Sequence, residues 1–513
     1  MVVAVWTALF AGWALSMGYA DWPLGDGWNR YLGNAIAIAE ADWGGYLPWR
    51  GPAHAWLCLA VMPLSGSLVR ASQWVALAST AALFPLTWAL GRALFGRWAG
   101  LVALGLLAAW PDLRLFAWFS SPYALEGALV AAGTLAGVVA ADAVGGRRAL
   151  LLLLAAMLFG VAIAVDVRGV TLTAAIALAL ALYGSERGQT PDRILSGRMN
   201  ADSPWAAGSN TRWARALRAL ALAAGAAAVG AGLYALLPVS FYSLASQVNL
   251  QRDHVAPLVA ACSARGDTAP TLADVTGPCG RALVQLNLTR AAAAIPLWLG
   301  IFPLVAAIGA WPRRWPDLGR RALLVLPLLT LAPALPVVAI QHRYLVPLAP
   351  FAAVLLAAGL GRIAVAVRAR APGLLPHAVL AGAVLVYALA WNLAGPSLRT
   401  RGPDAARGGT ATASLTHRGA VVVAADVIRV GYRPGERVTD CASANLRERL
   451  YPIPVGATDS GSALRACRGL GTRPPKAAGW LLTRAEGAPD SGWEVVFGGA
   501  TPGAVVLLRA GAE

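Results

Sequence analysis

Charged residues are scarce in this sequence: Asp, Glu, Lys and Arg together make up only 13% of its 513 residues, whereas hydrophobic residues make up 58%. At a mean hydropathy of +0.60, a soluble domain of this size has no means of burying so much apolar surface. The scarcity of charge therefore excludes an ordinary soluble globular protein. It predicts an α-helical protein that crosses the membrane several times.

Lysine is almost missing. Lys476 is the only one, so arginine carries nearly all of the positive charge behind the formal net charge of +17. The arginines gather in short loops between apolar runs, where positive residues report membrane topology. No stretch interleaves basic and aromatic residues along a surface that would follow a nucleic acid. The sequence thus argues against nucleic acid as a partner.

Eleven apolar runs predict eleven transmembrane helices within residues 1–395. Two of them, 98–110 and 169–183, are shorter than the roughly 20 residues that a straight helix needs, so we expect them to be short, tilted or re-entrant. The segment 54–69 contains Pro63 and Gly66, which favours a segment on the outer face. The runs are 2–20, 73–91, 98–110, 122–141, 149–165, 169–183, 216–238, 291–310, 322–340, 344–366 and 375–395.

Arginine is distributed unequally between the loops that these runs define. With the N-terminus inside, the inner loops hold seventeen arginines and five acidic residues, and the outer loops hold ten basic and nine acidic residues. The positive-inside rule then predicts an integral inner (plasma) membrane protein with a cytoplasmic N-terminus and outer loops 21–72 and 239–290. No basic segment precedes the first run, which favours a retained anchor over a cleaved signal peptide. A high Ala, Arg and Gly content indicates a GC-rich bacterial genome, in which case the outer side is the periplasm.

Residues 396–513 differ in composition from the membrane body. Pro, Gly, Thr and Arg are frequent in 396–418, as in a linker. Residues 419–513 predict a small periplasmic or extracellular domain, α/β or β-rich. Short apolar runs bounded by Gly and Pro predict strands at 419–430, 480–483 and 504–508.

Cysteine is rare, and four of the five cysteines fall on the predicted outer side in two sequence-local pairs. Cys262 and Cys279 lie in one loop, and Cys441 and Cys467 lie in the C-terminal domain. An oxidising compartment favours two disulfides, with four unpaired thiols as the alternative. No histidine accompanies either pair, which argues against zinc.

Asp26 lies just beyond the first apolar run, between Gly25 and Gly27, at the expected boundary of membrane and water. A carboxylate at this boundary meets both a lipid-borne substrate and a soluble one. Its position therefore favours chemistry at the outer membrane face. Asp21 lies in the same segment, and residues 27–41 have the pattern of an amphipathic interfacial helix that includes Tyr31.

Further polar residues fall at the outer ends of the predicted helices. Ionisable groups at membrane segments are costly, so they are functional candidates by default. For Arg168, contact with lipid headgroups and a purely structural pair with Asp166 are alternatives that the sequence leaves open. The candidates are Asp112, Glu126, Arg168, His342 and Arg343, with Tyr344 beside them.

Four sequence elements together resemble the GT-C superfamily of membrane glycosyltransferases, in particular the protein mannosyltransferase and aminoarabinose transferase branches (glycosyltransferase family 39). They are Gly25-Asp26 followed by Tyr31 and Ala35, Arg92–Gly96 followed by Trp110-Pro111, Val167-Arg168-Gly169, and His342-Arg343-Tyr344 continuing to Pro350. The resemblance covers roughly residues 1–395. It departs from the protein mannosyltransferases at Gly27, where they carry a second acid, so neither branch nor acceptor is indicated.

The resemblance implies transfer of a sugar from a polyprenyl-phosphate donor to an acceptor hydroxyl on the outer face. Asp26 would be the general base, and a single displacement would invert the anomeric centre. Arg168 and Arg343 would stabilise the phosphate, with His342 as a further donor. Asp112 or Glu126 would orient the acceptor or hold a divalent cation, the only cofactor that comes into question. Asp21, Tyr31 and Tyr344 complete the expected substrate site.

Two other functions stay open at this point: a transporter or flippase for lipid-linked sugars, and a non-catalytic membrane assembly protein. A transporter usually carries charged groups near the midplane, and the apolar runs are nearly free of charge. The sequence does not indicate the sugar, the acceptor class (lipid, glycan or protein), the metal dependence or the oligomeric state. It also leaves open whether the C-terminal domain binds the acceptor or a partner.

Overall fold

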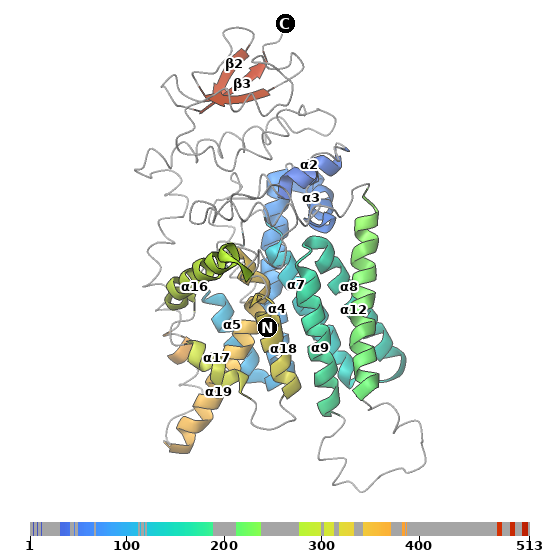
Figure 1. Cartoon of the computed structure of the whole chain (residues 1–513), viewed down its shortest axis with the longest axis vertical. Coiled ribbons are helices and arrows are strands. Elements are labelled where there is room, and N and C mark those ends of the chain that lie inside the picture. Colours follow the sequence, from blue (N-terminus) through green and yellow to red (C-terminus); the bar gives the residue numbers. More distant parts are fainter. Residues whose placement is uncertain are drawn as a thin grey trace. The chain divides into compact units, whose positions relative to one another are not determined.

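A computed structural model of the chain describes residues 31–39, 50–65, 68–110, 121–187, 212–237, 276–298, 302–311, 318–332, 342–370, 480–484, 493–497 and 505–510, with a few scattered positions besides (Figure 1). The chain divides into two compact units. The first comprises Met1–Ala11, Ser79–Arg114 and Tyr123–Gly395. The second comprises Gly12–Ala78, Leu115–Pro122 and Pro396–Glu513.

Where the structure describes the first unit, its regular elements are helices, as sequences rich in Ala and Leu favour. They begin with the second part of α4 (Leu68–Phe95), a helix that the boundary between the units divides. The others are α5 (Arg97–Ala108), α7 (Tyr123–Asp142), α8 (Gly145–Val165), α9 (Gly169–Arg187), α12 (Arg212–Ala235), α16 (Pro278–Trp298), α17 (Phe302–Ala310), α18 (Leu318–Leu329), the 3-10 helix η7 (His342–Leu348) and α19 (Ala349–Arg370).

Helices α7, α8, α9 and α12 pack against one another in what we call the four-helix cluster (Figure 1). Small residues bring α8 and α12 close together. A Cβ atom added to Gly230 would lie 2.8 Å from a side-chain carbon of Ile163, and one added to Gly160 would lie closer still to the side chain of Val229. Membrane helices gain no hydrophobic free energy by leaving lipid for one another, so such close packing is a main source of their association.

Five helical segments in the described part of the chain are long and apolar enough to cross a membrane: Arg70–Phe95, Tyr123–Asp142, Gly145–Val165, Ala216–Ala235 and Tyr344–Arg370. Pro52–Ser65, Arg97–Ala108 and Gly169–Tyr183 are shorter apolar helices. Large apolar side chains on α8, such as Leu150 and Leu153, are exposed, as expected of a lipid-facing surface. The multi-pass helical class is thus confirmed, while the number eleven stays a prediction.

The expected span 291–310 has a different form in the structure. Two helices cover it, α16 and α17, and α16 begins at Pro278, well before the apolar run. The earlier turns of α16 carry Arg281 and Gln285, so a reading based on apolar runs found only its second half. The expected helix 344–366 is likewise preceded by the 3-10 turn of η7, which contains Pro347.

Two arginines that the sequence marks as topology signals also bind backbone carbonyls at the end of α17. Arg321 of α18 donates to the Gly309 carbonyl, and Arg362 of α19 donates to the carbonyls of Ile308 and Trp311. These carbonyls have no partner within the helix, and cations near a helix C-terminus also favour its dipole.

The second unit contains α2 (Gly33–Ala39), α3 (Pro52–Ser65) and the start of α4. Of the expected helix 27–41, the structure describes residues 31–39 as helical, with Tyr31 and Leu32 in a wider helical turn before α2. Most of the segment 54–69 is helical despite Pro63, because α3 continues to Ser65. Pro63 lies in the last turn of α3, two residues before the helix ends at Ser65, so a kink at this proline affects only that turn.

Three strands also belong to the second unit: β1 (Trp480–Arg484), β2 (Trp493–Phe497) and β3 (Val505–Ala510). They form an antiparallel sheet in the order β1-β3-β2, with Leu481 opposite Leu508 and a bulge between Val495 and Phe497. β1 and β3 are two of the strands expected from the sequence, and β2 was missed. The expected strand 419–430 and the linker 396–418 lie outside the described residues, so the domain boundaries stay predictions.

Candidate functional site

A tight turn joins α8 to α9 and presents Arg168. The amide of Gly169 donates to the Asp166 carbonyl at 2.8 Å, and the amide of Val170 donates to the Val167 carbonyl at 3.1 Å. A Cβ atom on Gly169 would lie 3.0 Å from the carbonyl oxygen of Ala162 in the last turn of α8. A side chain at position 169 would press against the last turn of α8, which gives the glycine of Val167-Arg168-Gly169 a structural reason.

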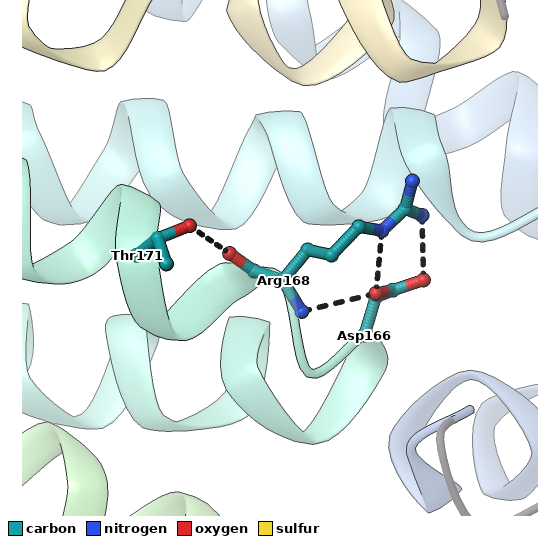
Figure 2. Close-up of polar contacts among 3 residues, drawn as sticks. All are labelled: Asp166, Arg168 and Thr171. Atoms are coloured by element: carbon teal, nitrogen blue, oxygen red, sulfur yellow. Dashed lines mark hydrogen bonds and ion pairs between the residues drawn. The ribbon is translucent and has the colours of Figure 1, made fainter. Parts of the chain in front are cut away.

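Asp166 fixes the guanidinium of Arg168 (Figure 2). The Arg168 Nε donates to Asp166 Oδ1 at 2.9 Å, and Nη2 donates to Oδ2 at 2.7 Å. The Arg168 backbone amide donates to the same Oδ1 at 3.1 Å, and the Thr171 hydroxyl donates to the Arg168 carbonyl at 3.0 Å. A two-bond fork of this kind sets the orientation of an arginine as well as its position. The pair of Asp166 and Arg168, one of the alternatives that the sequence left open for Arg168, is thus present in the structure.

Two tyrosines from other elements lie against the same guanidinium. The Arg168 Cζ is 4.1 Å from the ring centre of Tyr344 in η7 and 5.0 Å from that of Tyr123 at the start of α7. The two rings meet edge to face, with centres 5.6 Å apart. Cation–π contacts with both rings hold the side chain further, since an aromatic face attracts a cation within about 6 Å.

Electrostatics keep Arg168 charged. Burial alone lowers the pKa of Arg168, but the Asp166 carboxylate outweighs it, so the pKa is raised above its ordinary value. The Asp166 side chain is 1% exposed, whereas the Arg168 side chain is 31% exposed. The carboxylate of the pair is thus buried, whereas the guanidinium is partly exposed. Of the five N–H groups of a guanidinium, two are taken by Asp166, and the remainder suit an oxyanion such as phosphate.

Helix α7 and η7 are in direct contact beside this pair. A Cβ atom on Gly127 would lie 3.0 Å from Pro347 Cα and 3.4 Å from the Val346 carbonyl, so η7 rests on α7 where α7 has no side chain. Glu126 is buried in the first turn of α7, where the helix dipole favours a negative charge. The contact places Tyr344 next to Tyr123, one turn before Glu126.

A second buried polar cluster lies in the second unit. The guanidinium of Arg50 lies 4.8 Å from the ring centre of Tyr31, and both side chains are 2% exposed. Tyr46 and Asn34 donate to the Arg50 carbonyl at 2.7 and 3.3 Å. The ring of His54 meets that of Tyr31 edge to face at 6.0 Å. These contacts join the segment around Tyr31 to α3.

His54 also lies 3.6 Å from the sulfur of Cys58 one turn later on α3. Both side chains are buried, and Cys58 is a free thiol. With 14 residues, α3 is too short to cross the membrane. Burial lowers the pKa of His54 to about 4, so this histidine is neutral at pH 7.

Of the residues expected to bind substrate, the structure brings Arg168 and Tyr344 together, with Glu126 close by on α7. Tyr31 belongs to the other unit. His342 and Arg343 have their backbone in η7, but their side chains lie outside the described part of the structure, as do Asp21, Asp26 and Asp112. Tyr123 and Arg50 were missed, because neither belongs to a pattern that distinguishes it from an ordinary helix-end aromatic or loop arginine.

The cysteine and metal predictions are tested only in small part. Cys279 is disulfide-bonded, and Cys262, Cys441 and Cys467 lie outside the described residues, so both pairings stay predictions. Among the described residues, no group of three His, Cys, Asp or Glu side chains converges on a point that a metal ion would occupy. Both carboxylate oxygens of Asp166 already bind Arg168, so this site does not fit a cation.

No protein-family model matches the sequence, and the search among curated proteins returned no match. Among solved structures, the chain is similar to ArnT from Cupriavidus metallidurans bound to undecaprenyl phosphate, with 17% identity, a TM-score of 0.47, and coverage of 82% of this chain and 70% of that one. It is also similar to the archaeal oligosaccharyltransferase AglB from Archaeoglobus fulgidus in complex with an inhibitory peptide and a dolichol-phosphate, with 14% identity, a TM-score of 0.46, and coverage of 94% and 69%. At these identities and TM-scores the similarity carries no conclusion about what this chain does.

Proposed function

We propose that this chain is a membrane glycosyltransferase that moves a sugar from a polyprenyl-phosphate donor to an acceptor hydroxyl at the outer membrane face. The observation that carries the proposal is the contact of Arg168 with Tyr344. Val167-Arg168-Gly169 and His342-Arg343-Tyr344 are two of the four elements that resemble GT-C glycosyltransferases. They are far apart in the sequence, and this contact joins them in one site.

Arg168 is suited to hold the donor's phosphate. Its guanidinium is oriented before any ligand arrives, so little conformational freedom is lost on binding. It stays charged, and its exposed N–H groups match the oxygens of a phosphate. As the bond from the sugar to phosphate breaks, negative charge grows on the phosphate, and a fixed cation stabilises that charge without reorganising. Arg343, adjacent to Tyr344 in η7, is the proposed second phosphate ligand.

Asp26 is the proposed general base. It would take the proton of the acceptor hydroxyl while the hydroxyl oxygen attacks the anomeric carbon opposite the phosphate. One displacement of this kind inverts the anomeric configuration. The proposal includes the orientation that the arginine counts predict, with the N-terminus in the cytoplasm and Asp26 and Arg168 at the outer face.

The proposal is tested by transfer of labelled sugars from polyprenyl-phosphate donors to candidate lipid, glycan and peptide acceptors by the purified full chain in liposomes. Undecaprenyl phosphate is the first carrier to try. We expect transfer by the native chain, loss of transfer in Asp26→Asn, and retained transfer in the matched variant Asp42→Asn of the same loop. Transfer that persists in Asp26→Asn would instead assign the base to Asp21 or Asp112.

The phosphate role of Arg168 needs its own control. Arg168→Gln leaves the buried Asp166 carboxylate without its cation, so the double variant with Asp166→Asn is the proper comparison. Loss of charge-assisted hydrogen bonds worth about 1.5–3 kcal/mol predicts donor binding that is roughly 10–100 times weaker in the folded double variant. Donor binding at native strength in that variant would remove Arg168 from the site.

The transporter alternative makes a different prediction. A flippase would move a lipid-linked sugar across the bilayer in the absence of any acceptor, which a membrane-impermeant oxidant detects as a change in sugar accessibility. Such movement without transfer would favour the transporter. Donor binding with neither movement nor transfer to any acceptor would favour the assembly protein.

A further inference from the structure

A buried ring attaches the segment that begins at Tyr31 to the start of α3. The ring of Tyr31 contacts the guanidinium of Arg50, which lies 4.8 Å from its centre, and the ring of His54, which meets it edge to face at 6.0 Å. Both distances are within the ranges in which a cation and a second ring attract an aromatic ring. All three side chains are 2% exposed, so water does not compete for either contact.

Arg50 contacts the same part of the chain through its backbone as well. Its carbonyl accepts hydrogen bonds from the Tyr46 hydroxyl at 2.7 Å and from the Asn34 side-chain amide at 3.3 Å. Asn34 belongs to α2, and both donors are buried. Arg50 thus holds three separate positions, Tyr31, Asn34 and Tyr46, against the residues that lead into α3.

The His54 ring is itself held by Cys58. The Nε2 atom of His54 lies 3.6 Å from the Cys58 sulfur, one turn later on α3. Burial lowers the pKa of His54 to about 4 and raises the pKa of the Cys58 thiol, so both groups are uncharged at pH 7. A neutral contact between thiol and imidazole therefore restricts rotation of the ring that meets Tyr31.

Burying these polar side chains costs free energy that an apolar side chain of similar size would not cost. What the polar contacts add is a preference for one arrangement of the segment around Tyr31. Asp26 precedes Tyr31 by five residues, so their Cα atoms are at most about 18 Å apart, whatever path the chain takes between them. Fixing Tyr31 therefore limits the space that Asp26 can reach.

We propose that Arg50 and His54 are positioning residues, which hold Tyr31 and through it keep Asp26 within reach of the acceptor hydroxyl. The inference rests on the proposed function, in which Asp26 is the general base. A base acts only within hydrogen-bond reach of the proton that it removes, and a misplacement of about 1 Å can lower a rate about 100-fold. Arg50 and His54 act through Tyr31 in this proposal.

The first test is hydrogen–deuterium exchange of residues 21–30 in the full chain in detergent, which requires no sugar transfer. His54→Ala removes the ring that meets Tyr31, and exchange in this segment should become roughly 2–10 times faster. His54→Phe keeps an aromatic edge at this position and should exchange nearly as the native chain does. Leu57→Ala is the matched control, because Leu57 lies on the same helix and is 38% exposed.

The second test is steady-state sugar transfer by the same variants. We expect His54→Ala to lower kcat about 10–100 times, because the base is misplaced relative to the reacting atoms. The KM for the donor should stay within about twofold of the native value, because the proposed phosphate ligand Arg168 is unchanged. His54→Phe should restore most of kcat. Should His54→Ala unfold, Tyr31→Leu compared with Tyr31→Phe tests the same contact from its other side.

The two tests separate this proposal from the proposed function. Exchange in His54→Ala that is no faster than in Leu57→Ala would overturn the positioning role, whether or not the chain transfers sugar. A kcat as low in His54→Phe as in His54→Ala, with native exchange in the phenylalanine variant, would also overturn it. No transfer by the native chain would overturn the proposed function and the catalytic part of this proposal, while faster exchange in His54→Ala would still establish that α3 holds the segment.

Discussion

The two ends of the four-helix cluster use arginine in opposite ways. At one end, Arg168 is paired with a buried carboxylate and lies against two tyrosines, so its position is fixed and the pair is neutral. At the other end, Arg148 and Arg218 line one cavity that includes no acidic side chain. A cation paired with a carboxylate is held in one orientation, whereas two neighbouring cations repel each other. The first arrangement suits a site that must hold a ligand in a defined position.

The largest change in the free energy of unfolding should come from removing the ion pair between Arg168 and Asp166. Arg168→Leu removes the cation that binds both oxygens of the buried Asp166 carboxylate, and we expect a loss of about 3–5 kcal/mol in the free energy of unfolding. Denaturant unfolding in detergent measures it. Asp166→Asn/Arg168→Gln should recover most of the loss, because it removes both charges. A single variant as stable as the double one would show that the carboxylate is not buried as described.

Lowering the pH leaves the arginines at both ends of the four-helix cluster protonated, but it should destabilise the second unit through His54. The pKa of His54 is 6.5 in the unfolded chain and about 4 in the folded chain. Between these two pH values the unfolded chain is protonated at His54 and the folded chain is not. Stability is therefore complete above pH 6.5 and falls as the pH drops to 4, by about 3 kcal/mol in total at 1.36 kcal/mol per pH unit. Unfolding at pH 7 and pH 4.5, with His54→Gln as the control, measures it. The control should lose distinctly less.

The aromatic contacts at the Arg168 end should have an intermediate effect. Tyr344→Leu removes the ring face closest to the guanidinium, whereas Tyr344→Phe keeps it. A cation–π contact of about 0.5–2 kcal/mol predicts donor binding that is roughly 2–30 times weaker for the leucine variant. The phenylalanine variant should bind nearly as the native chain does. Equal weakening in both variants would assign the effect to the tyrosine hydroxyl and not to the ring.

The smallest effect is expected from Arg148, at the other end of the four-helix cluster. Arg148→Gln in detergent without anionic lipid should change the free energy of unfolding by less than about 0.5 kcal/mol, because it removes a repulsion and no buried partner. The same measurement that detects Arg168→Leu applies. A loss of several kcal/mol would mean that Arg148 is held by a structural partner, and the contrast between the two ends would no longer hold.

Much of the fold followed from local pattern. The spans 122–141 and 149–165 were expected within a few residues of α7 and α8, because uninterrupted apolar runs of bilayer length allow no other structure. Prediction from apolar runs failed where polar and apolar residues are mixed within one element or where the element is short. The first half of α16 carries Arg281 and Gln285, and β2 is short, so neither resembled a helix or strand in the sequence.

The candidate site was predicted in its parts but not in its geometry. Arg168 and Tyr344 were expected at the outer face because polar groups at helix ends are costly without a role. Tyr123 was missed, since nothing in its local sequence shows that it lies against a guanidinium from another loop. Asp26 remains a prediction, and it is the residue on which the proposed chemistry most depends.

The sequence by itself determined that this protein crosses a membrane, because apolar runs and the scarcity of charge act locally and need no partner. It also offered the pair of Asp166 and Arg168 as one alternative, since a carboxylate two residues before an arginine can bind it within one loop. The tertiary structure alone decided which distant residues meet: Tyr123 and Tyr344 at Arg168, and Arg148 with Arg218 at the cavity. These contacts depend on the close packing of whole helices, where glycines such as Gly127 and Gly160 set the distance between them, and no local pattern contains that information.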